Sequence, residues 1–204
     1  IDWAKLRDTV RVAVRFLDDV IEVNRYPFPQ IERMSKGNRK IGLGVMGFAH
    51  LLILLEVPYD SDEAVRIAEE VMAFINEEAH RASSELAQER APFPNFPKSV
   101  YAQRGERPLR NATLTTIAPT GTLSIIADCS AGIEPLFGLA YRRRILGDVE
   151  IFTLDPLFVR VMREEGILPA EGEIREGDLP PSLPERWERL FLTALQIPPR
   201  RHVE

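Results

Sequence analysis

The chain has 204 residues, 45% of them hydrophobic, which is long and apolar enough to build the core of one ordinary domain. Its 26 Lys and Arg residues against 31 Asp and Glu residues leave a formal charge of −5, which excludes a general attraction to a nucleic-acid backbone. It contains neither an apolar run of about 18 residues nor a basic-then-apolar leader. We therefore expect a cytoplasmic protein that neither crosses a membrane nor binds nucleic acid.

Helical periodicity dominates the N-terminal half of the chain. Apolar residues recur every three or four positions over residues 3–21, which predicts an amphipathic helix that ends before Pro27. A second apolar run, from about Val45 to Leu55, predicts a buried helix. The longest helix should follow a cap at Asp60 or Ser61, because apolar positions at helical spacing continue well beyond it.

The next segments lose this periodicity. Three prolines within residues 92–97 predict an extended connection without a helix. Residues 111–117 are rich in Thr, Leu and Ile, which predicts a short buried strand. After a Pro-Thr-Gly-Thr turn, the apolar run 123–127 predicts a short helix.

The C-terminal part of the chain alternates short elements. Strands are expected near Leu139 to Leu146 and over 149–154, and a helix with proline in its first turn over 156–165. Residues 166–184, rich in Gly, Pro and Glu, predict a surface excursion before a last helix through 187–195. The elements together predict an α/β chain that is mostly helical and forms a single domain.

Cys129 is the only cysteine, which excludes an internal disulfide, a cysteine-based zinc cage and any chemistry that needs two thiols. Cys129 follows Asp128, but no histidine accompanies it in the sequence, so a structural thiol is favoured over a nucleophile. The histidines lie too far apart in the sequence to predict a metal site: His50, His80 and His202.

The segment Gly42–Gly47 matches the G-x-G-x-x-G pattern of dinucleotide-binding proteins. That pattern requires a hydrophobic strand before its first glycine, whereas a polar turn is expected here over Lys36–Lys40. The acidic residue expected about twenty positions later is also missing, because Asp60 sits at a helix cap. We favour the interpretation that these glycines let a buried helix start close to neighbouring backbone.

The segment from Ala118 to Ser124 has the composition of an anion-binding turn. A strand leads into a proline, a glycine allows close approach of a ligand, and backbone N–H groups converge at the start of the next helix. The alternative is an ordinary capped helix, in which the hydroxyls serve only as caps, and the residues alone do not decide between the two. The residues that would form the anion site are Pro119, Thr120, Gly121, Thr122, Leu123 and Ser124.

Three longer segments occur in the same order in the large subunits of ribonucleotide reductases. They are Gly37–Ala49, Arg110–Thr113 with Ile117–Thr122, and Cys129–Phe137. The chain resembles this family over most of its length, and the sequence of these segments is most similar to that of the adenosylcobalamin-dependent class.

The resemblance implies reduction of ribonucleotides to 2′-deoxyribonucleotides by a thiyl radical inside a ten-stranded α/β barrel, of which residues 1–204 would form a part. It implies adenosylcobalamin as the cofactor of the whole enzyme. In that family the loop that matches residues 119–124 binds the phosphates of the substrate, largely through backbone N–H groups. The segment Gly42–Gly47 would belong to the barrel framework.

The departures from the family concern the catalytic thiols. The family's Asn-x-Cys-x-Glu radical loop and its two reducing cysteines do not occur, and Cys129 matches a position outside that set. The sequence therefore predicts an internal fragment without a catalytic residue of its own, inactive alone, whose partners are a ribonucleotide, the remaining reductase polypeptide or further copies of itself. The alternative is a catalytically inactive relative that binds only nucleotides or a partner chain.

Overall fold

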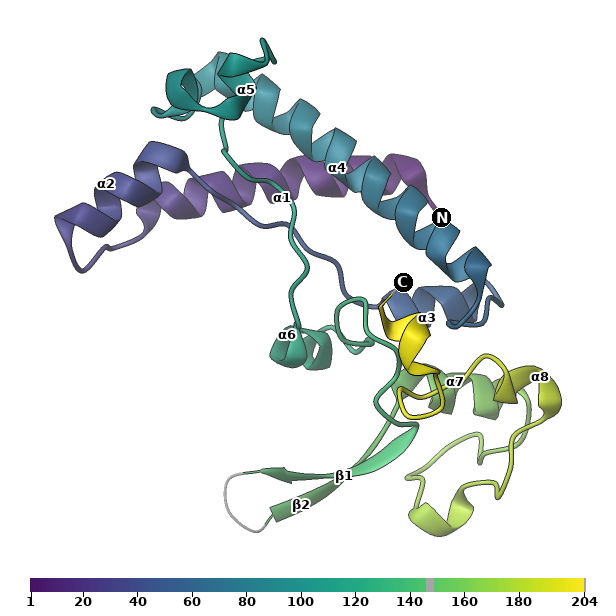
Figure 1. The fold of residues 1–204 in the computed structure, drawn as a ribbon. Coiled ribbons are helices and arrows are strands. Elements are labelled where there is room, and N and C mark those ends of the chain that lie inside the picture. The colour runs from purple at the N-terminus through teal and green to yellow at the C-terminus, as the bar shows by residue number, and fades with distance from the viewer. Residues whose placement is uncertain (146–148, 204) are drawn as a thin grey trace. The chain divides into compact units, whose positions relative to one another are not determined.

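The computed structural model describes residues 1–145 and 149–203, which form two compact units (Figure 1). Unit 1 comprises residues 1–44 and 68–117, and unit 2 comprises residues 45–67 and 118–204. The single domain expected over residues 1–204 stays a prediction. About half of the described residues are helical and two strands form a small sheet, which agrees with the α/β class predicted from the sequence. None of the helices within them is long and apolar enough to cross a membrane.

The elements follow one another in a fixed order that Figure 1 labels. They are α1 (Trp3–Val23), α2 (Pro29–Asn38), α3 (Phe48–Leu54), α4 (Asp62–Arg90), η1 (Phe96–Lys98), α5 (Val100–Gln103), α6 (Gly121–Ile126), β1 (Ala140–Ile145), β2 (Val149–Leu154), α7 (Pro156–Glu164), η2 (Glu176–Asp178), α8 (Glu185–Glu188) and η3 (Pro199–His202). The η elements are short 3₁₀ helices.

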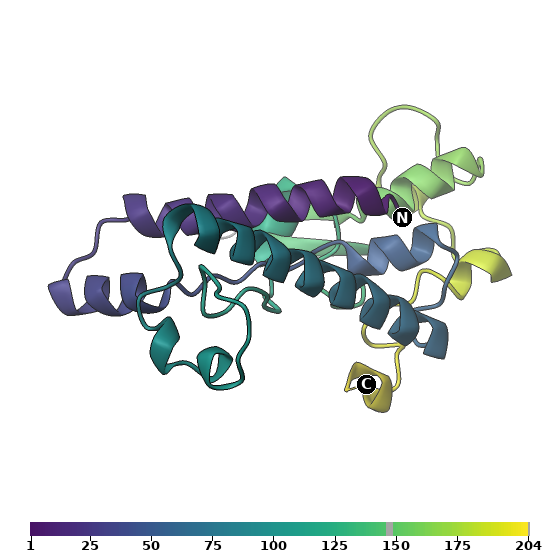
Figure 2. The same cartoon turned by 90° about the horizontal axis from the view of Figure 1, so that it is seen from above.

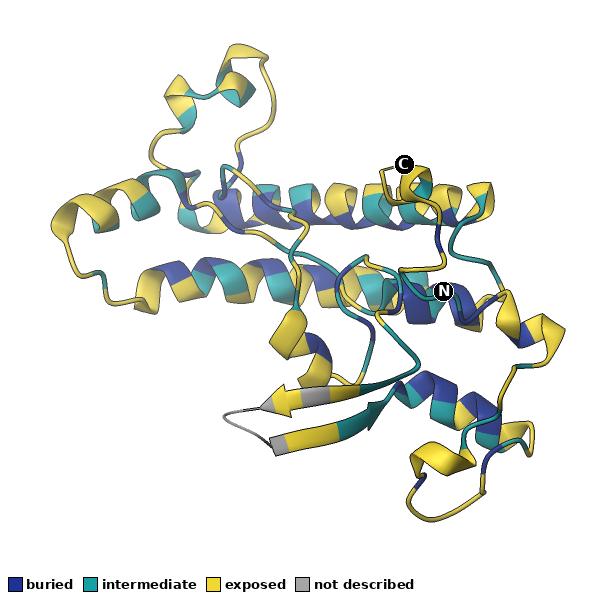
Figure 3. Ribbon diagram, turned by 60° about the horizontal axis from the view of Figure 1, so that its bottom comes forward, coloured by how far each residue is buried: buried dark blue, intermediate teal, exposed yellow. Residues whose placement is uncertain are grey.

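Unit 1 is built on α1 and the unit 1 part of α4, which lie side by side and run in the same direction (Figure 2). Ion pairs join them in register at 3.3, 3.0 and 2.7 Å: Arg7–Glu78, Arg11–Glu85 and Arg15–Glu89. The buried residues of each helix form a stripe along it (Figure 3), which is the amphipathic pattern predicted from the sequence.

A buried ionic cluster joins four segments of unit 1. Asp18 of α1 is fully buried and its carboxylate accepts hydrogen bonds from Arg39 Nε at 2.8 Å, Arg110 Nε at 3.2 Å and Asn111 Nδ2 at 2.9 Å. Ser83 of α4 donates to Asn111 Oδ1 at 2.9 Å. Burial by itself raises the pKa of Asp18, but the hydrogen bonds and charges of Arg39, Asn111 and Arg110 outweigh it and hold the pKa below its ordinary value.

The segment predicted as a buried strand forms less sheet than expected. Residues 113–116 run parallel to residues 41–43: the N–H of Ile41 donates to the carbonyl of Thr113 at 3.1 Å, and one bridge joins Leu43 to Thr115, but neither segment forms a regular strand. Ile117 is 71% exposed, so the prediction that the segment is buried is wrong for its end. A segment with one short neighbour leaves the backbone groups of its other edge without a partner strand.

Unit 2 has its core around α7, whose start is capped by Asp155. β1 and β2 pair antiparallel, from Ala140 opposite Leu154 to Ile145 opposite Val149, and the predicted strand end at Leu146 lies outside the described residues. Buried residues of several elements complete the core: Ala49, Ile53, Leu136, Leu157, Phe158, Val161, Met162, Leu168, Ile174, Trp187, Leu190 and Phe191.

Several predicted helix bounds need correction. The helix α2 was not predicted; it starts at a proline, and its last turn contains Lys36 to Asn38 of the expected polar turn. Arg39 then ends it in a left-handed conformation. The helix expected from Val45 begins only at Phe48, because Gly47 adopts φ 80°. The start of α4 is confirmed: of the two caps expected, Asp60 and Ser61, Ser61 is the one whose Oγ accepts from the N–H of Ala64, at 3.1 Å.

Two further expectations were wrong in part. The proline-rich connection contains one 3₁₀ turn, η1, although its prolines exclude a longer helix. The last helix is the single turn α8, because the following residues turn toward Leu136, which bridges to Thr193 and accepts the N–H of Ala194 at 2.8 Å.

We expect Asp18→Asn to lower the free energy of unfolding by about 3 kcal/mol at pH 7, because it removes the charge that neutralises buried arginines. Asp19→Asn, on the half-exposed neighbour, should cost less than about 1 kcal/mol. Since the pKa of Asp18 is lowered in the folded chain, its contribution is present above the ordinary pKa and is lost as the pH falls through the folded value.

Urea titrations at several pH values measure both effects. The difference in the free energy of unfolding between the native chain and Asp18→Asn should be constant near neutral pH and should become smaller below about pH 4. A gap that does not depend on pH would contradict the charge argument.

Candidate functional site

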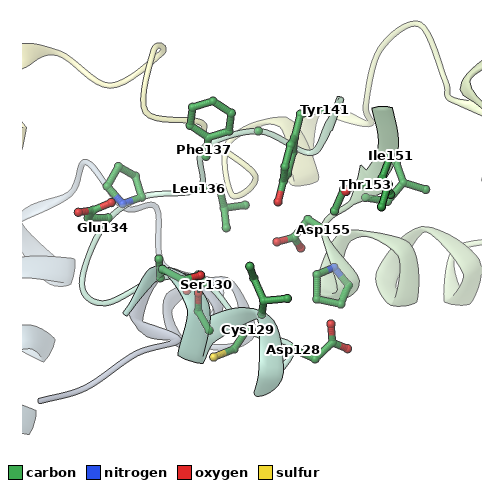
Figure 4. A pocket seen from close by; sticks show the side chains of 18 of the residues that line it. Asp128, Cys129, Ser130, Glu134, Leu136, Phe137, Tyr141, Ile151, Thr153 and Asp155 are labelled. Carbon is green, nitrogen blue, oxygen red and sulfur yellow. Dashed lines mark hydrogen bonds between the residues drawn. The ribbon is translucent and has the colours of Figure 1, made fainter. Parts of the chain in front are cut away.

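Unit 2 contains a pocket of about 660 Å³ between α6, the loop that follows it, the β1–β2 hairpin and the start of α7 (Figure 4). This is the volume of a site for a small organic ligand. Gly121 and Ser124 of the predicted anion loop line it. Its wall also carries Cys129, Ser130 and Asp155, whose side chains Figure 4 shows around the opening.

The predicted anion loop leads directly into α6. Thr120 adopts φ 48° and ψ 26°, and α6 starts at the next residue. Ser124 is the first residue of α6 whose N–H has a partner, the carbonyl of Thr120 at 2.8 Å. Among the described residues, no group accepts from the N–H of Gly121, Thr122 or Leu123. These amides therefore remain as donors at the start of α6, and Gly121 is the one of the three residues that lines the pocket.

The hydroxyls of the loop are arranged differently from the expectation. Thr120 Oγ1 does not cap α6 but accepts a hydrogen bond from the N–H of Gly132 at 2.7 Å. Ser124 is buried and its hydroxyl donates to the carbonyl of Gly121 at 3.3 Å. Thr122 is exposed, as are Pro119 and Leu123. The loop thus offers its ligand backbone amides more than hydroxyls.

A histidine that the sequence did not connect to this site contacts two of the residues that line the pocket. His50 Nε2 is 2.8 Å from Asp155 Oδ2, and both residues are buried. The N–H of Ser130 donates to His50 Nδ1 at 3.3 Å. Ser130 Oγ faces the main-chain N–H of His50 and not its ring, so the arrangement is not a nucleophile triad. His50 and Asp155 are 105 positions apart in the sequence, so no sequence pattern predicts the pair.

Cys129 is half-buried in the wall of the pocket. Burial, and after it the charge of Asp128, raises the pKa of its thiol. A nucleophilic or redox-active cysteine requires the opposite shift, because the thiolate is the reactive form. The geometry therefore supports the structural interpretation of Cys129.

The glycines of the segment Gly42–Gly47 serve close packing. A Cβ on Gly42 would lie 2.9 Å from the side chain of Thr116, and Gly47 adopts a positive φ at the start of α3. The residues immediately before Gly42 follow α2 as a loop, within the part of the chain that the structure describes. The dinucleotide alternative needs a strand there and is therefore eliminated.

The chain matches known proteins over its whole length. The family described as "Ribonucleotide reductase, barrel domain" matches residues 1–204. The chain is 49% identical over 207 residues to the "Vitamin B12-dependent ribonucleoside-diphosphate reductase" of Thermoplasma acidophilum and 48% identical over 208 residues to the protein of that name from Mycobacterium tuberculosis H37Rv. It is 30% identical over 252 residues to the "Ribonucleoside-diphosphate reductase subunit alpha" of Chlamydia pneumoniae.

All of this chain aligns with each of these relatives, but it covers only 27%, 29% and 24% of their respective lengths. It therefore spans less than a third of the relatives it matches.

Gly132→Ala should destabilise unit 2 more than Gly166→Ala. Both glycines have positive φ, which alone costs an alanine about 1–2 kcal/mol. A Cβ on Gly132 would lie 2.8 Å from the carbonyl oxygen of Ala118, whereas a Cβ on Gly166 meets nothing within 4 Å. The clash should add about 1–3 kcal/mol in urea unfolding. Equal costs for the two variants would show that residue 132 does not lie against the backbone of the anion loop.

Proposed function

Because the chain belongs to the ribonucleotide reductase barrel-domain family, we propose that it supplies the substrate-phosphate loop and part of the barrel of an enzyme that reduces ribonucleotides to 2′-deoxyribonucleotides. The observation that carries this proposal is the set of unpartnered amides of Gly121, Thr122 and Leu123 at the start of α6, of which Gly121 lines the pocket. Amides at a helix start bind the oxygens of phosphate groups. The residues of the loop are Pro119, Thr120, Gly121, Thr122, Leu123 and Ser124.

The substrate proposed for this loop is a ribonucleoside diphosphate, since the relatives are named ribonucleoside-diphosphate reductases. A diphosphate offers several anionic oxygens to the amides at the start of α6. The rest of the nucleotide would extend into the pocket of about 660 Å³.

The reducing chemistry would come from the rest of the reductase polypeptide. Replacement of the 2′-hydroxyl by hydrogen releases water and consumes two electrons, which a pair of thiols supplies as it closes to a disulfide. Cys129 is the only thiol of this chain, and its raised pKa opposes such a role. The thiyl radical and the reducing thiols therefore belong to other segments, and this chain alone would be inactive.

Adenosylcobalamin is the cofactor proposed for the complete enzyme, since two of the relatives are named vitamin B12-dependent. Bound there, it would supply the radical. Both ring nitrogens of His50 are occupied by Asp155 and Ser130, so this imidazole is not free to ligate cobalt. We assign the corrin to the rest of the polypeptide. The cytoplasmic location and a homo-oligomeric state stay predictions.

Gly121→Val should weaken binding of ADP to the chain without unfolding it. A side chain at residue 121 meets no protein atom within 4 Å but enters the space beside the free amides. We expect a loss of at least about tenfold in affinity, as for one hydrogen bond to a charged group. The matched control is Gly177→Val, a position that is also open but does not line the pocket. Calorimetry measures both, and equal affinities would count against the loop.

A chimera tests the catalytic part of the proposal. This chain would replace the matching 27% of the Thermoplasma acidophilum reductase. We expect cobalamin-dependent formation of deoxynucleotide by the chimera and none by the isolated chain, and Gly121→Val in the chimera should raise KM. Turnover by the isolated chain would contradict the assignment of the thiols to other segments. A chimera that folds and binds ADP without turnover would instead favour the inactive, nucleotide-binding relative.

A further inference from the structure

His50 and Asp155 form a buried pair that joins two elements of unit 2. His50 lies in α3 and Asp155 caps α7, and they are 7% and 8% exposed. Asp155 Oδ2 is 2.8 Å from His50 Nε2, while Oδ1 accepts the N–H of Phe158 at 2.9 Å. Because both oxygens of the carboxylate have partners, the side chain is held in one orientation.

The second ring nitrogen selects the tautomer of His50. The N–H of Ser130 points at Nδ1, and a backbone N–H can only donate, so Nδ1 carries no proton. The proton of the neutral ring therefore lies on Nε2 and is donated to Asp155. Ser130 is also held by Gly47, whose N–H donates to its carbonyl at 2.7 Å. The main chain at Ser130 is thus fixed from both sides.

Two residues further on, this fixed segment meets the phosphate loop. The N–H of Gly132 donates to Thr120 Oγ1 at 2.7 Å, and the position of a Cβ on Gly132 is 2.8 Å from the carbonyl oxygen of Ala118. The backbone at residue 132 therefore lies directly against residues 118–120. Thr120 adopts the left-handed conformation that a β-branched residue disfavours, so it needs such support.

We propose that His50 and Asp155 are positioning residues for the phosphate loop. The imidazole, oriented by Asp155, fixes the segment from Ser130 to Gly132, and this segment holds Thr120 in the conformation that leaves the amides of residues 121–123 unpartnered at the start of α6. The inference rests on the proposed phosphate binding by that loop.

The test compares His50→Phe with Thr120→Val in the full chain. His50→Phe removes both ring hydrogen bonds and keeps an aromatic ring. Thr120→Val removes only the hydroxyl to which the N–H of Gly132 donates. Each should shift the ligand-free amide resonances of Gly121, Thr122 and Leu123 and weaken ADP binding by roughly tenfold or more. Because both substitutions break the same series of contacts, the double variant should bind ADP no more weakly than whichever single variant binds it more weakly.

A second variant guards against a failure of His50→Phe to fold. Asp155→Asn keeps an oxygen for the N–H of Phe158 but turns an amide N–H₂ toward the N–H of His50, so it breaks the pair at almost constant volume. It should shift the same loop amides. Urea unfolding of each variant separates this local effect from a general loss of stability.

Matched controls are available in unit 1. His80→Phe replaces a histidine bonded only to the carbonyl of Asn76 among the described residues. Asp2→Asn changes a helix cap, that of α1, which has no histidine partner there. Neither should shift the loop amides.

The proposal is overturned if folded His50→Phe or Asp155→Asn leaves the ligand-free amide resonances of the loop at their native positions. It is also overturned if the losses of ADP affinity caused by His50→Phe and Thr120→Val add up in the double variant. A different result tests the proposed function: if ADP leaves the loop amides of the native chain unshifted, phosphate binding fails. The ligand-free resonances of the variants still decide the positioning role in that case.

Discussion

A hydrogen bond from the amide of Gly132 to the hydroxyl of Thr120 fixes the residue at which the extended segment turns into α6. Thr120 is left-handed there, at a cost of about 1–2 kcal/mol, and one neutral hydrogen bond contributes only about 1 kcal/mol. The bond alone does not hold Thr120, so the close approach of Gly132 to Ala118 and the fixed main chain at Ser130 must contribute. The unpartnered amides of the loop depend on all of these contacts together.

Both units use a buried carboxylate to join distant segments, but the groups that bind the carboxylate differ in charge. In each, a buried carboxylate joins segments that lie far apart in the sequence: Asp18 binds Arg39 and Asn111 in unit 1, and Asp155 binds His50 in unit 2. Asp18 faces permanent cations, so its pKa is lowered and its contribution depends on charge. Asp155 holds the Nε2 side of the imidazole, so its contribution lies in direction: it orients the ring whose Nδ1 meets the N–H of Ser130.

The sequence predicted what depends on local pattern and missed what depends on distant contacts. The amphipathic α1, the long α4, the hairpin strands and the proline start of α7 follow from periodicity and turn residues, and they are confirmed. The helix α2 was missed because its sequence is polar and interrupted by glycine, and it buries none of its residues. In the candidate site, the turn before α6 could be located from its Pro-Thr-Gly-Thr composition. The roles of Thr120 and His50 could not, since Gly132 and Asp155 reach them only through the fold.

The exposure of α6 bears on why the loop would act only within a larger polypeptide. Ser124 is the one buried residue of this helix, while Leu123, Ile125 and Ile126 are 58%, 52% and 77% exposed. Apolar side chains gathered on one short helix usually mark a surface that another segment covers. The relatives are more than three times as long as this chain, so they contain polypeptide that could cover it. Under the proposed function, the helix that presents the phosphate-binding amides is also the one left uncovered, which ties substrate binding to assembly of the barrel.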